Sequence, residues 1–144
     1  MKSPVLLTIA LAFWLLQSCG EGELPSSSAG QSTQSDRSPL EVVNQRMSAY
    51  NGHDLGAFLE TYSEEVAIYT YPDRSLGKGK KHLRSIFEPM FEEGTAQVTV
   101  HHQIAKDGYV VNHETVTDGD KATEYVSIYE VRGGLIESVR FVRD

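Results

Sequence analysis

Cysteine is almost absent from this chain, and the one residue present is Cys19. A lone cysteine cannot form an internal disulfide, and the absence of any later cysteine excludes thiol catalysis by the rest of the chain. Basic residues are also few, because 13 Lys and Arg stand against 20 Asp and Glu, for a formal net charge of −7. That balance argues against a nucleic-acid partner, whose phosphates attract clustered Lys and Arg.

Long hydrophobic runs are missing as well. The run Val5–Leu16 has only 12 residues, fewer than the roughly 20 that a membrane-spanning helix needs. Lys2 before it and the small Ser18 after it complete the pattern of a secretory signal peptide. The order Leu, any residue, Ser, Cys also resembles the lipobox, where a bacterial signal peptide is cut before a cysteine that then receives lipid. We therefore expect lipidation of Cys19, for example with palmitate.

Three regions follow from this interpretation: a signal peptide at 1–18, a lipidated cysteine with a flexible tether at 19–38, and one folded domain at 39–144. The tether is rich in Ser, Gly and Gln and has little to bury, so ordering it would cost entropy without compensation. It would span roughly 25 Å. We expect an extracytoplasmic protein bound to membrane lipid, and the Gly20 that follows the cysteine favours the outer membrane if the source has two. An ordinary secreted protein and an uncleaved membrane anchor remain as alternatives.

The folded part begins with helical patterns and continues with strand patterns. Ser38-Pro39-Leu40-Glu41 is typical of a helix start, and the first helix should stop at Asn51-Gly52. A second helix should begin at His53-Asp54 and place Tyr62 on its apolar face, and a third is expected near Lys80–Phe91 after a loop through Gly77. The expected strands are Val66–Tyr71, Gln97–Ile104, Tyr109–Thr117, Thr123–Val131 and Leu135–Arg143.

These elements predict an α+β domain in which three N-terminal helices pack on a strongly curved, mostly antiparallel sheet. The turns Lys106-Asp107-Gly108, Asp118-Gly119-Asp120 and Gly133-Gly134 favour antiparallel neighbours among the last four strands. A sheet of this kind forms a cone, and its open end can hold a small molecule.

Three segments, Val42–Leu55, Val110–Glu114 and Ile128–Ile136, resemble those of SnoaL-like proteins. These proteins belong to the nuclear transport factor 2-like superfamily, which also contains ketosteroid isomerase. The resemblance covers residues 40–143. It implies a curved sheet, three helices, a central pocket and often a homodimer through the sheet, but it says little about function, because this fold carries many activities.

The comparison with ketosteroid isomerase can be made at three positions. By the resemblance, the helix Tyr of that enzyme falls on Arg46, its carboxylate base on Thr70 or Tyr71, and its late-strand Asp on Ser127. None of the three chemical groups is present. We therefore do not expect the ketosteroid isomerase mechanism here.

Glu114 is the candidate catalytic residue. Alternation along its strand places it on one face with Val110, Asn112 and Val116, and by the resemblance that face points into the cone. A carboxylate flanked by apolar residues is a candidate general base. Equally, Glu114 could form a structural ion pair with Arg46 or face water at an edge.

The candidate ligand-binding residues come from three other elements. Arg46 on the first helix could pair with Glu114 or hold an anionic ligand. The strand expected at Thr123–Val131 should place Tyr125 and Ser127 on one common face. The full set of ligand-binding candidates is Arg46, Tyr69, Tyr71, Asn112, Tyr125 and Ser127. Tyrosines at such positions serve packing more often than chemistry.

No metal site and no cofactor are expected. His101 and His102 are adjacent on a strand, so their side chains should point to opposite faces, and at most one could join His113. No further Cys or His completes a coordination shell.

Two functions follow. The first is a membrane-tethered module whose cone binds a small apolar or amphipathic ligand. The alternative is a proton-transfer enzyme, an isomerase, dehydratase or hydrolase, with Glu114 as general base and help from Tyr69, Tyr125 or Arg46. A structural role through dimerisation of the sheet is a weaker third possibility.

Overall fold

The computed structural model describes residues 36–144, so the predicted signal peptide and Cys19 lie outside the described residues. Within this range there are three helices, α1 (Pro39–Asn51), α2 (Leu55–Glu60) and α3 (Lys80–Glu93). The strands are β1 (Tyr62–Thr70), β2 (Arg74–Lys78), β3 (Ala96–Lys106), β4 (Tyr109–Asp118), β5 (Lys121–Arg132) and β6 (Leu135–Val142). None of the helices in the described range is long and apolar enough to cross a membrane.

Helix α1 begins at the capping box that the sequence predicts. The Ser38 side chain accepts a hydrogen bond of 3.3 Å from the backbone N–H of Glu41, and the Glu41 carboxylate accepts one of 2.7 Å from the N–H of Ser38. The helix ends at Asn51, as expected. There the Asn51 amide donates to the carbonyl of Val98 over 3.0 Å and accepts from its N–H over 2.7 Å. Both ends of α1 are therefore fixed, and with them the face that it turns to the sheet.

Helix α2 is shorter than predicted. Asp54 caps it as expected, but it ends at Glu60, and the expectation that Tyr62 continues its apolar face is wrong. The carbonyl of Thr61 accepts a 2.8 Å hydrogen bond from the N–H of Ile136 in β6. Because the sheet takes up the chain at that residue, Tyr62 becomes the first residue of β1.

A short strand replaces the loop expected around Gly77. Strand β2 pairs antiparallel with β1, with Gly77 opposite Ile68. Four of its five residues are exposed and none is buried, so no alternating apolar pattern marks it as a strand. Its Leu76 nonetheless reaches the cavity described below.

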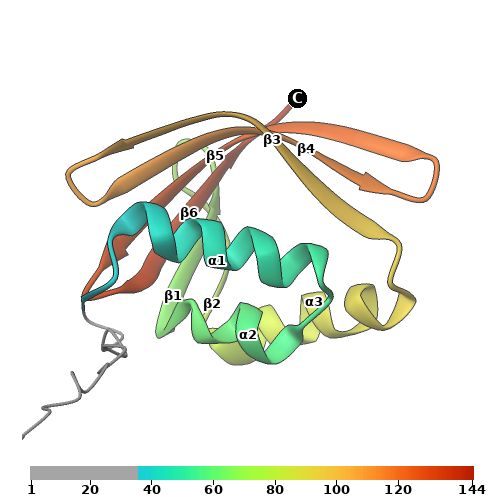
Figure 1. The fold of residues 1–144 in the computed structure, drawn as a ribbon, viewed down its shortest axis with the longest axis horizontal. Coiled ribbons are helices and arrows are strands. Elements are labelled where there is room, and N and C mark those ends of the chain that lie inside the picture. The colour runs from blue at the N-terminus through green and yellow to red at the C-terminus, as the bar shows by residue number, and fades with distance from the viewer. Residues whose placement is uncertain (1–35) are drawn as a thin grey trace, which may run out of the picture. The chain divides into compact units, whose positions relative to one another are not determined.

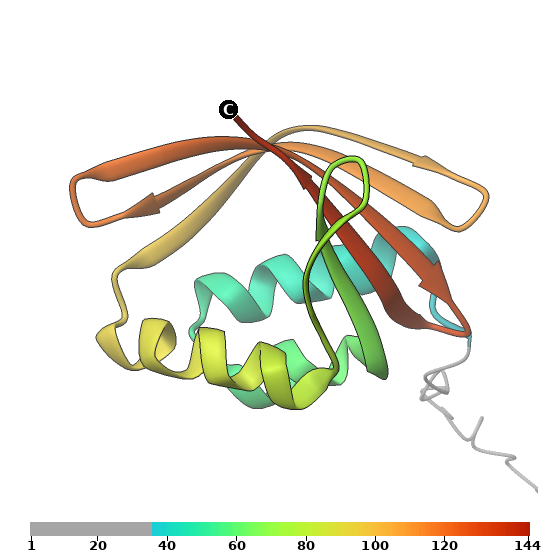
Figure 2. The same ribbon diagram turned by 180° about the vertical axis from the view of Figure 1, so that it is seen from behind.

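The sheet has the order β2-β1-β6-β5-β4-β3. All neighbours pair antiparallel except β1 and β6, which pair parallel. Figure 1 shows the strands arching over the helices, and Figure 2 shows the same arrangement from behind. The prediction of an α+β fold with helices packed on a strongly curved, mostly antiparallel sheet is confirmed.

Aromatic rings join the helices to one another. The ring centroid of Phe58 in α2 lies 4.6 Å from that of Phe87 and 5.3 Å from that of Phe91, both in α3. Tyr50 of α1 lies 6.2 Å from Phe58 and 5.4 Å from Phe91. Each such pair contributes roughly 0.5–1.5 kcal/mol beyond the area that it buries. The helices therefore form one packed layer below the sheet.

Candidate functional site

A cavity of about 240 Å³ lies between the helical layer and the inner face of the sheet. Its wall is largely apolar, with side chains from β1, β2 and α3: Ile68, Leu76, Leu83, Ile86, Phe87 and Met90. Polar side chains that are almost fully buried also line it, among them Arg46 from α1, Tyr62 from β1 and Glu114 from β4. We call these three the polar end of the cavity.

Glu114 is only 2% exposed, which excludes the expectation that it faces water at an edge. Its Oε1 accepts hydrogen bonds from the Ser127 hydroxyl over 2.7 Å and from the Tyr129 hydroxyl over 3.3 Å. Its Oε2 accepts one from the Asn112 amide over 3.1 Å. In all three contacts the oxygens of Glu114 are the acceptors.

The strand register explains why these four side chains meet. Asn112 and Glu114 are two residues apart on β4 and so share a face, as the alternation predicted. On β5 the same holds for Ser127 and Tyr129, and Asn112 lies directly opposite Ser127. All four side chains are buried. The inner face of two adjacent strands thus builds a cradle for one carboxylate.

Amide side chains extend this cradle outward. The Gln103 amide of β3 donates to the Oδ1 of Asn112 over 2.9 Å and to the Oδ1 of Asn44 over 3.1 Å. Because the Gln103 nitrogen can only donate, the Oδ1 of Asn112 must face Gln103. The Nδ2 of Asn112 is then left to donate to Glu114.

Arg46 is 4% exposed and is held by aromatic and sulfur contacts. Its Nε donates to the Tyr62 hydroxyl over 2.9 Å, and its Nη1 to the Met47 sulfur over 3.2 Å. The guanidinium carbon lies 5.1–5.5 Å from three ring centroids, those of Tyr50, Phe58 and Tyr129. Cation–π contacts of this kind are stronger when they are desolvated.

The surroundings keep Arg46 charged. Burial by itself lowers the pKa of Arg46, but the phenol oxygens of Tyr129 and Tyr62 and the carboxylate of Glu114 together outweigh burial, and the net pKa lies above the ordinary arginine value. Arg46 and Glu114 nevertheless form no direct ion pair among the described residues, so the expected structural ion pair is absent. The two charges attract each other across the polar end of the cavity without contact.

The buried tyrosines remain protonated at neutral pH. Burial raises the pKa of Tyr129 well above the ordinary tyrosine value, although Arg46 acts in the opposite direction. Burial likewise raises the pKa of Tyr62, again against the effect of Arg46. Both hydroxyls therefore keep a proton to donate, and that of Tyr129 donates to Glu114. Tyr62 lines the cavity.

The structure sorts the predicted ligand-binding residues into three groups. Arg46 and Tyr125 line the cavity, as does Glu114. Asn112 and Ser127 lie behind Glu114 and contact its carboxylate instead of the cavity. Tyr69 and Tyr71 lie outside the cavity: the Tyr69 ring packs against the guanidinium of Arg140 at 4.8 Å, and Tyr71 is 56% exposed.

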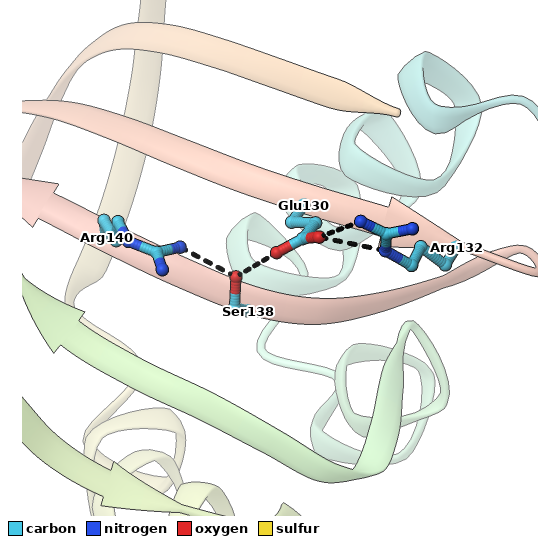
Figure 3. Close-up of polar contacts among 4 residues, drawn as sticks. All are labelled: Glu130, Arg132, Ser138 and Arg140. Carbon is cyan, nitrogen blue, oxygen red and sulfur yellow. Dashed lines mark hydrogen bonds and ion pairs between the residues drawn. The ribbon is translucent and has the colours of Figure 1, made fainter. Parts of the chain in front are cut away.

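A separate chain of polar contacts runs on the outer face of the sheet (Figure 3). Arg140 donates to the Ser138 hydroxyl over 3.0 Å, and Ser138 donates to Glu130 over 3.0 Å. Arg132 donates to the same carboxylate through Nε and Nη2, over 2.9 and 2.6 Å. Hydrogen bonds from Arg132 outweigh partial burial and lower the pKa of Glu130.

Sequence reasoning missed Tyr62 as a residue of the site. The acidic pair Glu64-Glu65 breaks the apolar alternation in the first half of β1, so Tyr62 matched a helical spacing better than a strand. Conversely, the position of Tyr69 follows from the pattern of the strand: Val66 and Ile68 are the apolar inner residues of β1, and Tyr69 has the opposite parity.

The histidines of β3 correct another expectation. The pairing of β3 with β4 shifts register between Val100 and His102. As a result both adjacent histidine rings lie beside His113. The ring centroid of His101 is 5.1 Å from that of His113, and the ring centroid of His102 is 5.8 Å from it. The expectation that only one of the two could approach His113 is wrong, since a bulge interrupts strict alternation. His113 itself bonds Glu124, and His101 bonds Thr115. The described residues contain no cluster of three or more His, Cys, Asp or Glu arranged to hold a metal ion.

A family model described as a SnoaL-like domain matches residues 43–139. A search of curated proteins finds no match. Among solved structures, an uncharacterized cystatin fold protein from Novosphingobium aromaticivorans is similar with a TM-score of 0.68 at 22% identity, over 74% of this chain and 99% of that one. A putative ketosteroid isomerase from Kribbella flavida gives 0.59 at 20% identity, over 72% and 75%. An LEH-like epoxide hydrolase from M. tuberculosis gives 0.61 at 16%, over 74% and 82%. At these identities the likeness is one of fold.

Proposed function

We propose that the domain, which belongs to the family of SnoaL-like domains, binds a small, largely apolar ligand in this cavity. The proposal is drawn from the cavity because the fold carries many unrelated activities. The observation that carries this proposal is the composition of the cavity lining. The wall is apolar, and Arg46, Tyr62 and Glu114 form its polar end. Apolar walls with a few convergent polar groups are typical of small-molecule sites.

The size of the cavity limits the ligand. Its volume of about 240 Å³ exceeds that of an engineered apolar cavity of roughly 150 Å³ that binds benzene. The ligand is therefore somewhat larger than one aromatic ring, and its apolar body lies against α3 and the β1–β2 hairpin.

A proton-transfer enzyme is the second candidate, and the contacts of Glu114 favour it. Three hydrogen bonds fix this carboxylate, and a fixed carboxylate beside a cavity can act as general base. Tyr62 and Arg46 would then stabilise negative charge on the substrate. Similar folds include the putative ketosteroid isomerase and the epoxide hydrolase named above. By the family resemblance, however, Arg46, Thr70 or Tyr71, and Ser127 stand where the ketosteroid isomerase mechanism needs its three groups.

The proposal also includes the place where the ligand is bound. Cys19, as the lipid-bearing first residue of a mature lipoprotein, would hold the domain at the cell envelope, outside the cytoplasm, and at the outer membrane if the source has two. The lipobox resemblance supports this part. A homodimer through the sheet stays a prediction, and the exposed Ile104, Tyr109 and Val126 on β3, β4 and β5 are consistent with it.

Filling the cavity tests the binding proposal. Val116 lines the cavity, whereas its neighbour Thr115 lies on the opposite face of β4. We expect native mass spectrometry of the full chain to detect a co-purified small molecule, and Val116→Phe to reduce its occupancy at least about tenfold. The matched control Thr115→Phe should retain the ligand. An empty wild-type chain that also shows no thermal shift with any apolar probe would contradict the proposal.

A further inference from the structure

We infer that the cavity prefers a ligand whose polar head is uncharged and both donates and accepts hydrogen bonds, as an alcohol does, over the matching carboxylate or ammonium compound. The inference rests on the proposed binding function and names the chemical class of the ligand. It follows from the unused hydrogen-bonding capacity of the polar end and from its balance of charge.

The unused donors belong to Arg46 and Tyr62. Arg46 donates a hydrogen bond from Nε to the Tyr62 hydroxyl and one from Nη1 to the Met47 sulfur. Its Nη2 has no hydrogen-bond partner among the described residues. The Tyr62 hydroxyl accepts from Arg46 and donates to no described residue, so its own proton is available. Both side chains are almost fully buried and line the cavity. A ligand that offers an acceptor would therefore make hydrogen bonds with these two groups that the described residues leave unmade.

The unused acceptor belongs to Glu114. Its Oε1 already takes two hydrogen bonds, from Ser127 and Tyr129, whereas its Oε2 takes only one, from Asn112. A carboxylate oxygen can accept two. Glu114 lines the cavity, so its Oε2 is the place for a donor on the ligand. A head that accepts from Arg46 or Tyr62 and donates to Glu114 satisfies both sides.

The charges of the polar end disfavour a charged head on the ligand. One guanidinium and one carboxylate, both almost fully buried, balance to zero. A ligand carboxylate would bring a second negative charge to Glu114, and a ligand ammonium would bring a second positive charge to Arg46. In either case the site would hold an uncompensated charge away from water, which is strongly unfavourable. Arg143 also lines the cavity but is exposed, so water screens its charge.

Four probes with one apolar body test this inference: 3-phenylpropan-1-ol, 3-phenylpropanoate, 3-phenylpropylamine and propylbenzene. Their dissociation constants would be measured by isothermal titration calorimetry at pH 7 on the full chain. We expect the alcohol to bind at least about tenfold more tightly than either charged probe.

Two substitutions shift the charge of the polar end and should shift the preference. Glu114→Gln leaves a net positive charge and should raise the affinity for 3-phenylpropanoate at least about tenfold relative to the alcohol. Arg46→Gln leaves a net negative charge and should do the same for 3-phenylpropylamine. Glu124→Gln, a matched change on the outer face of the sheet, should leave the order unchanged. Circular dichroism establishes which variants fold, and the wild-type order is decisive if Arg46→Gln does not.

The outcomes separate the two proposals. If no probe binds, including propylbenzene, the proposed binding function fails and the inference fails with it. If probes bind but a charged one equals or exceeds the alcohol, the inference is overturned while the binding function stands. The inference is likewise overturned if Glu114→Gln folds and leaves the affinity of 3-phenylpropanoate relative to that of the alcohol unchanged.

Discussion

The Ser127 hydroxyl donates a 2.7 Å hydrogen bond to Oε1 of Glu114, and both side chains are buried. This bond joins two adjacent strands on the inner face of the sheet, where water does not replace it. Together with the bonds from Asn112 and Tyr129 it provides the solvation that burial removes from the carboxylate. The position of Glu114 at the cavity is therefore set by neighbours that do not touch the cavity themselves.

Removing the Ser127 hydroxyl should destabilise the fold. Ser127→Ala leaves one hydrogen bond of a buried carboxylate unmade, and we expect a loss of about 1–3 kcal/mol in the free energy of unfolding. Urea denaturation at pH 7 measures it. Ser85→Ala is the matched control, because Ser85 is exposed on α3 and bonds only the carbonyl of His82. Equal losses for the two variants would show that the hydrogen bond to Glu114 stabilises the fold no more than the exposed hydrogen bond of Ser85 does.

Arg46→Met should cost more than any exposed arginine. The substitution keeps an apolar chain in place but removes the charge that attracts Glu114 and the donor to Tyr62. We expect a loss on the order of 3 kcal/mol in the free energy of unfolding. Arg84 on α3 is exposed and pairs with Glu88 four residues later, so Arg84→Met should change stability by less than about 1 kcal/mol. A smaller loss for Arg46→Met than for Arg84→Met would refute the electrostatic interpretation.

Acid should weaken the outer face of the sheet through Glu130. Its pKa is lowered in the folded state, chiefly by hydrogen bonds from Arg132. The stabilisation is therefore present above the unfolded pKa, about 4.3 for a glutamate, and is lost as pH falls through the lower folded value. The stability difference between wild type and Glu130→Gln should be constant from pH 7 to about 5 and shrink below about 4.3. Urea unfolding midpoints between pH 7 and 3 measure this difference.

The matched control for that titration is Glu92→Gln, at an exposed residue near the end of α3. The stability difference between wild type and Glu92→Gln over the same pH range is the reference against which the Glu130→Gln difference is judged. A Glu130→Gln difference that grows on acidification would have the wrong sign and would reject the assignment.

Local patterns were sufficient for part of the site. The capping box fixed the start of α1, and strict alternation on β4 placed Asn112 and Glu114 on one common face, which the family resemblance assigned to the inside of the cone. These inferences succeed because each depends on residues within a few positions of one another.

The remaining features depend on contacts between distant segments. Tyr62 enters the site because the carbonyl of Thr61 bonds Ile136, 75 residues later in the chain. The approach of His101 to His113 depends on an irregularity in the pairing of two strands. Neither has a local signature, so sequence periodicity alone could not find them.

Substitution of Cys19 tests the proposed anchor. In Cys19→Ala the thiol that would receive lipid is absent, so we expect the protein to lose palmitate labelling and to leave the membrane fraction of its host. Ser18→Ala is the matched control, because a small residue before the cysteine is retained. Membrane association of Cys19→Ala equal to that of wild type would contradict the proposal.

Gly77 of β2 tests how the hairpin that carries Leu76 is held. A Cβ at this residue would lie 2.1 Å from ring atoms of His82, whose Nε2 is 3.1 Å from the carbonyl oxygen of Leu76. The φ angle of Gly77 is 153°, a conformation that side chains rarely adopt. Gly77→Ala should therefore displace the His82 ring and strain the strand, with a loss of about 1–3 kcal/mol in the free energy of unfolding.

A double-mutant cycle separates the two causes of that loss. His82→Ala removes the ring that the new Cβ would meet, so Gly77→Ala should cost less in the His82→Ala background than in wild type, and the cost that remains reports backbone strain alone. Gly56→Ala is the control, since Gly56 lies in α2 and a Cβ there meets only an Asp54 oxygen at 3.4 Å. It should be neutral or stabilising by up to about 1 kcal/mol. An equal cost of Gly77→Ala in both backgrounds would show that the His82 ring plays no part in holding the hairpin.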